Sequence, residues 1–138
     1  MKQNKMLKEN IPYAKLIYSA LDLCEAMLSK SALLYPFAVV SIDNDVQCLF
    51  THYENRDAQQ GMIEELEEQI GTIRLTANNT VGVLVYAATI AAPNGEESDA
   101  LVFSISDSAN NNTITLYPYT LGDNTVELSK PYTCDFFN

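Results

Sequence analysis

The 138-residue chain has no tryptophan, one histidine, three cysteines and five glycines, and each shortage excludes a kind of site. Cys24, Cys48 and Cys134 form no C-x-x-C pair, so we expect neither a disulfide framework nor a zinc site. Their thiols are predicted to be reduced, as in a cytoplasmic protein. Cys24 and Cys48 lie in apolar stretches, which favours buried and unreactive thiols.

The few glycines form neither G-x-G-x-x-G nor a phosphate-binding loop, and no G-x-S-x-G nucleophile motif occurs. Asp43 and Asp45 match the start of a calcium loop, but the glycine and the distal glutamate that complete such a loop are missing. The sequence therefore predicts no cofactor and no bound metal ion.

Positive charge is also scarce, because 8 Lys and Arg residues face 18 Asp and Glu residues, which gives a formal net charge of -10. Such a surface repels nucleic-acid phosphates and anionic lipids, so we expect no binding to nucleic acid or to a membrane. The same charge favours a basic protein partner. Charges such as Asp22 and Glu25 interrupt the first apolar stretch, which excludes a signal-peptide core or a transmembrane helix there.

Apolar residues at spacings of three and four predict two amphipathic helices. The first covers residues 12–31 and follows a flexible start at residues 1–10. The second begins near Asp57 and ends at Gly71 or, because the period continues, at Thr76. Its polar face carries four acidic residues that we term the acidic ridge: Glu64, Glu65, Glu67 and Glu68.

Short apolar and β-branched runs predict the strands. Residues 37–42 and 46–53 are expected to form a hairpin around the turn residues 43–45. Residues 80–91 are apolar on both alternating rows, which is typical of a central strand in a sheet covered on both faces.

Two further strands are predicted at residues 99–106 and 113–117, and Pro118 places the end of the second at an edge of the sheet. Residues 120–138 form a tail in which residues 126–128 could add a short strand. We expect the tail to dock on the domain or on a partner, since two phenylalanines lie near its end.

The element order α-β-β-α-β-β-β predicts one α+β domain over residues 1–138, with an antiparallel sheet of about five strands and two helices on one face. The apolar side chains of residues 80–91 that point to the other face of the sheet then need another element to cover them. We favour a homodimer partner over the tail for this role.

Two sets of residues are candidates for binding. Like charges three and four residues apart on the acidic ridge repel one another, so a cationic partner would stabilise them; the alternative is a solvated helix face. Tyrosine is favoured at binding surfaces, and three tyrosines could gather on one sheet face, although core packing is the alternative: Tyr86, Tyr117 and Tyr119.

An enzyme is the second hypothesis. His52 is the only histidine, so a Ser–His or Cys–His mechanism would need it. Paired carboxylates are the other option, and the candidates flank the second helix or follow a turn: Glu54, Asp57, Glu96, Glu97 and Asp99.

Several short segments between the first helix and residue 119 resemble small uncharacterised bacterial α+β proteins. They are Pro36-Phe37-Ala38-Val39-Val40, Val85-Tyr86, Ser98-Asp99-Ala100-Leu101 and Tyr117-Pro118-Tyr119. The resemblance covers about residues 12–119 and implies the layout described above, with no activity attached. Some small acidic bacterial domains act as immunity or partner proteins, by analogy of size and charge.

Taken together, these features predict a non-catalytic, immunity-like or partner-binding protein that forms a homodimer. The alternatives are a small hydrolase-like enzyme that uses His52 or a carboxylate pair, and a small-molecule-binding module near Tyr86 on the second sheet face.

Overall fold

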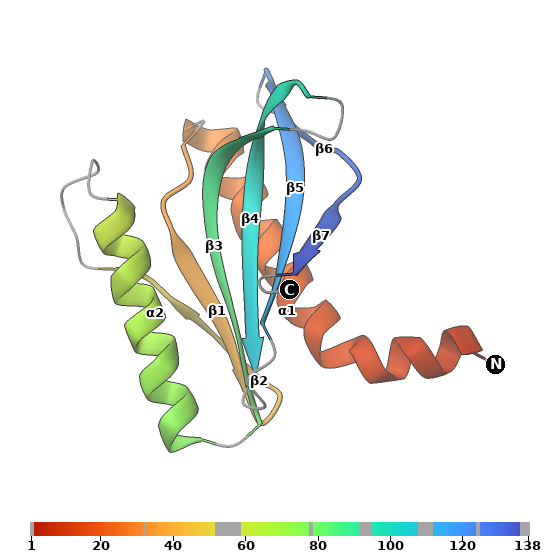
Figure 1. The fold of residues 1–138 in the computed structure, drawn as a ribbon, viewed down its shortest axis with the longest axis vertical. Coiled ribbons are helices and arrows are strands. Elements are labelled where there is room, and N and C mark those ends of the chain that lie inside the picture. The colour runs from red at the N-terminus through yellow and green to blue at the C-terminus, as the bar shows by residue number, and fades with distance from the viewer. Residues whose placement is uncertain are drawn as a thin grey trace.

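The computed structural model describes residues 2–31, 33–51, 59–77, 79–91, 95–107, 112–123 and 125–135, and side chains from residue 14 to residue 133. The elements in chain order are α1 (Lys2–Ser31), β1 (Phe37–Ile42), β2 (Asp45–Leu49), α2 (Gln59–Thr76), β3 (Thr80–Ala91), β4 (Glu97–Asp107), β5 (Asn112–Gly122), β6 (Thr125–Leu128) and β7 (Tyr132–Asp135). Figure 1 shows the strands as one twisted sheet between the two helices.

The strands pair in the order β2-β1-β3-β4-β5-β6, and β7 also pairs with β5. All pairs are antiparallel. The α+β class predicted from the sequence is thus confirmed, and β3 has the predicted bounds and an interior position. Asp43 and Asn44 form the two-residue turn between β1 and β2. Both have positive φ, as a type I′ hairpin turn requires.

The two helices cover opposite faces of the sheet (Figure 1). Val83 and Val85 of β3 belong to the core under α1, whereas Leu84 between them packs with Leu66 and Ile70 of α2. The prediction that both helices share one face was therefore wrong. Amphipathic stripes show that each helix covers a sheet, but they do not say which face. The second row of β3, which was expected to need a homodimer partner, is covered by α2 at Leu84, while Tyr86 and Ala88 of the same row stay partly exposed.

The helix α1 begins at Lys2, ten residues before the predicted start at residue 12. Its buried residues follow a spacing of four and include Leu16 and Ala20, both with no exposed surface. Burial, together with the nearby charge of Glu25, raises the pKa of the Cys24 thiol to about 12. Cys48 was also expected to be buried, but it is exposed on the edge strand β2.

The tail adds two strands instead of one. Both β6 and β7 pair with the same side of β5, so that the sheet has seven strands where about five were predicted. The strand β5 continues through Pro118, and the register of β7 stops at Leu116 while that of β6 starts at Tyr119. The Pro118 carbonyl accepts a bond of 2.7 Å from Ser129 N in this gap. The missing N–H of Pro118 faces the same gap, so it costs no ladder bond to β4.

Candidate functional site

The acidic ridge lies on the outer side of α2 and extends to the edges of the helix that border the sheet. Glu64, Glu67 and Glu68 are exposed, while Glu65 is half-buried and accepts a hydrogen bond of 3.1 Å from Gln69 Nε2. None of these four carboxylates forms an ion pair with any residue that the structure describes. Their mutual repulsion is therefore not offset within the described part of the domain.

The three candidate tyrosines do not gather on one face. Tyr86 lies opposite Val102, whereas Tyr117 lies opposite Leu101, and this offset of one residue places them on opposite faces. The Tyr117 ring contacts Phe103 with centroids 5.0 Å apart, and Tyr119 is 8% exposed in the core under α1. The prediction of a shared tyrosine face was wrong. Alternation decides which side chains of one strand share a face, but for residues on two strands the answer depends on the register between them.

Glu67 and Tyr86 are brought together by the fold. Burial raises the pKa of the Tyr86 hydroxyl, and the negative charge of Glu67 raises it further. This electrostatic effect requires the helix residue and the strand residue to be neighbours. The candidate site therefore lies along the margin of α2 that borders the sheet.

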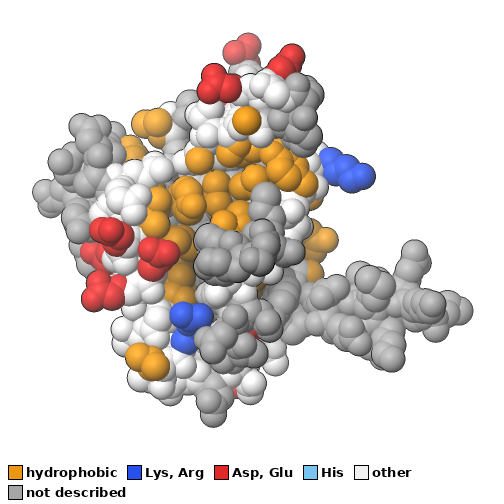
Figure 2. Space-filling model, viewed as in Figure 1, with side chains coloured by type: hydrophobic (Ala, Val, Ile, Leu, Met, Phe, Trp, Pro, Cys, Tyr) orange, Lys and Arg blue, Asp and Glu red, His pale blue; other side chains and the backbone are white. Residues whose placement is uncertain are grey.

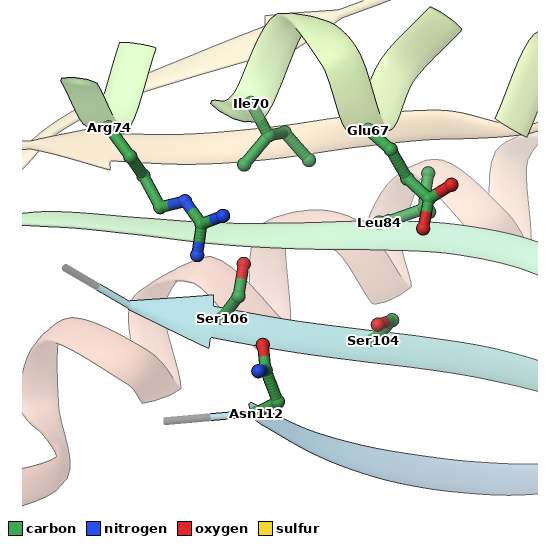
Figure 3. Close-up of a pocket in the computed structure, with 7 residues that line it drawn as sticks. All are labelled: Glu67, Ile70, Arg74, Leu84, Ser104, Ser106 and Asn112. Atoms are coloured by element: carbon green, nitrogen blue, oxygen red, sulfur yellow. The ribbon is translucent and has the colours of Figure 1, made fainter. Parts of the chain in front are cut away.

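A cleft of about 280 Å³ occupies this margin (Figure 3). The helix α2 supplies Glu67, Ile70 and Arg74, which reach toward the strands. The strands supply an apolar contact and three polar groups: Leu84, Ser104, Ser106 and Asn112. Arg74 is the only cation of α2. The cleft thus presents both signs of charge above a polar floor.

The polar floor comes from a change of character along β4. On the α2 side its residues change from Ala100 and Val102 to Ser104 and Ser106, whereas Phe103 stays apolar on the α1 side. No described residue makes a hydrogen bond to either serine hydroxyl or to the Asn112 amide. These residues were not predicted as a site from the sequence, although the alternation of β4 already separates the two serines from its apolar row.

Two hydrogen bonds and one glycine hold α2 at its distance from the sheet. Gln59 Nε2 donates to the Ala87 carbonyl at 3.2 Å, and Arg74 Nη1 donates to the Asp107 carbonyl at 3.5 Å. A Cβ atom at Gly82 would lie 2.8 Å from Cγ2 of Ile70. Only a residue without a side chain allows the helix this close to β3, so Gly82 fixes the depth of the cleft.

Beyond the cleft, α2 leaves part of the sheet uncovered. Figure 2 shows hydrophobic side chains spread over the strands beside the helix. These partly exposed residues share the α2 side by strand register: Tyr86, Ala88, Ile114, Leu116, Pro118 and Tyr132. We term them the open sheet face. The Tyr132 hydroxyl is buried and makes no hydrogen bond to any residue that the structure describes.

The enzyme candidates do not converge in the described part of the chain. His52, Glu54 and Asp57 lie outside the described residues. Glu96, Glu97 and Asp99 are exposed near the turn between β3 and β4, and none of them lines the cleft.

A metal site or a membrane span is likewise not found in these ranges. No group of three or more His, Cys, Asp or Glu side chains within the described ranges could hold a metal ion. No helix among the same residues is long and apolar enough to cross a membrane.

The fold and site define an α+β domain with a mixed-charge cleft beside a partly open sheet. Comparison with protein families, curated proteins and solved structures finds no match to this chain. The function must therefore be argued from the surface itself.

Proposed function

We propose that the protein is a non-catalytic binding protein whose α2 side recognises a basic protein partner, as an immunity-like or other partner protein would. One observation carries the proposal: the unpaired acidic ridge borders the open sheet face on the same side of the molecule. Charge and exposed apolar surface together are what a specific protein interface needs.

Each part of this surface has its own role. The exposed carboxylates of Glu64 and Glu68 attract a cationic partner and accelerate its association. The open sheet face supplies the apolar area that a charged surface alone lacks, and Tyr86 and Tyr132 supply aromatic contacts.

The experiment is affinity capture from native cell lysate on the immobilised protein, at about 0.1 M and about 1 M salt, where the Debye length is about 10 Å and about 3 Å. We expect a basic protein to be retained at low salt and released at high salt. A Glu64→Gln/Glu68→Gln variant should lose it. The matched control is Glu25→Gln/Glu127→Gln, which changes the net charge equally at exposed sites on α1 and β6.

Retention of the partner by both variants, or capture of no basic protein by the wild type, would refute the proposal. Light scattering tests the competing homodimer. If the protein is a dimer that Leu116→Arg dissociates, the open sheet face serves self-association and the proposal fails.

A further inference from the structure

The cleft beside α2 has properties that partner binding does not use. Arg74 makes one hydrogen bond to a described residue, at 3.5 Å to the Asp107 carbonyl, and a guanidinium has five N–H donors. Its remaining donors are available to an anion. A carboxylate matches their planar geometry best, because it can accept two parallel hydrogen bonds.

Glu67 supplies the opposite charge at the other end of the cleft. Figure 3 shows Arg74 and Glu67 reaching from α2 toward the strands on either side of Ile70. They are seven residues apart, which corresponds to about 10 Å along a helix, and no ion pair joins them among the described residues. The two charges therefore remain separate and available to a ligand that carries both signs.

The dimensions of the cleft limit the ligand. A volume of about 280 Å³ holds about nine water molecules at about 30 Å³ each. This suits a molecule of roughly ten non-hydrogen atoms. Ser104, Ser106 and Asn112 lie between and below the charged ends and offer hydroxyl and amide groups to its polar middle.

We propose that this cleft binds a small zwitterion of dipeptide length, with its carboxylate on Arg74, its ammonium group on Glu67 and its central amide over Ser104, Ser106 and Asn112. An extended dipeptide spans about 7 Å between its ends. With one hydrogen bond of about 2.8 Å at each end, it is long enough to join groups carried by two residues whose backbone positions lie about 10 Å apart along α2.

The charge pattern also disfavours ligands of one sign. Glu67 repels a simple anion at Arg74, and Arg74 repels a simple cation at Glu67. A ligand with both charges satisfies each group, and the site discriminates against the others by leaving one charge unpaired. This inference does not rest on partner binding, whose test uses Glu64 and Glu68, and neither of these residues lines the cleft.

The test is a titration of the full-length ¹⁵N-labelled protein with L-alanyl-L-alanine, followed by NMR. We expect saturable shifts of Ser104, Ser106 and Asn112, with a dissociation constant of about 1 mM or tighter. N-acetyl-alanyl-alanine amide, which lacks both charges, and free alanine should each bind at least about tenfold more weakly.

Variants identify the charged partners. Arg74→Gln and Glu67→Gln should each weaken dipeptide binding at least about tenfold, whereas Glu68→Gln, on the outer side of α2, should not change it. Thermal unfolding checks that all three variants fold. The proposal is overturned if the capped dipeptide, alanine or inorganic phosphate binds as tightly as the dipeptide. Shifts elsewhere, or binding that survives both variants, would overturn it equally.

Discussion

The two faces of the sheet are built differently. Under α1 the core is closed, and Phe37, Val85 and Phe103 have no exposed surface. Under α2 only part of the sheet is covered, and Ser104 and Ser106 take positions that could have been apolar. The α1 face therefore buries most of the large side chains of the core, while the other face keeps polar and partly exposed groups that stability alone does not require.

The largest expected effect tests this division directly. Phe103→Ala removes a fully buried ring from the α1 side and should reduce the free energy of unfolding by about 3–5 kcal/mol. Ile114→Ala removes a half-buried side chain from the open sheet face and should cost only about 1 kcal/mol. Urea denaturation of both variants measures the difference. Equal losses would show that the two faces contribute alike to stability.

A smaller effect is expected at the contact between α2 and β3. Gly82→Ala forces Ile70 or the helix to move and should cost about 1–3 kcal/mol. Gly71→Ala on α2, the helix that Gly82 faces, is the control, because nothing lies within 4 Å of its new Cβ. It should stabilise the protein by up to about 1 kcal/mol. Thermal unfolding of the two variants decides, and a neutral Gly82→Ala would mean that α2 is not held closely.

The smallest effect concerns one tyrosine on each face. Glu67→Gln removes a negative charge that disfavours the ionised Tyr86 hydroxyl, so the pKa of Tyr86 should fall toward its ordinary value while burial still keeps it raised. The pKa of Tyr117, which is raised by burial and by Tyr18 on the other face, should stay unchanged. An NMR titration of ring-labelled tyrosines measures both. A Tyr86 pKa unaffected by the substitution would show that Glu67 does not lie near Tyr86.

The elements were more predictable than their arrangement. The bounds of β1 and β3 match the predicted ranges residue by residue, because both strands are apolar on two rows and end at turn residues. The strand β5 was predicted too short, since Pro118 was taken as its end, and its neighbours β6 and β7 came from a segment with a weak alternating pattern. The sequence of a strand that contains a proline does not indicate which neighbouring strands will pair on either side of that proline.

The candidate site was predictable only in part. Glu67 and Tyr86 were both selected from the sequence, but their proximity depends on the side of the sheet on which α2 packs. Arg74, Ser104 and Ser106 were not selected, because a lone arginine and two serines carry no motif. Their meeting in one cleft depends on strand register and on the close approach at Gly82.

The sequence by itself determined the α+β class, the interior position of β3 and the acidic surface of α2, since periodicity and charge act locally along the chain. The tertiary structure alone decided that the helices lie on opposite faces, that Tyr86 is separated from Tyr117 and Tyr119, and that Arg74 and Glu67 border one cleft. These outcomes depend on contacts between residues distant in sequence. A stripe or a strand pattern specifies that a face must be buried, but not what buries it.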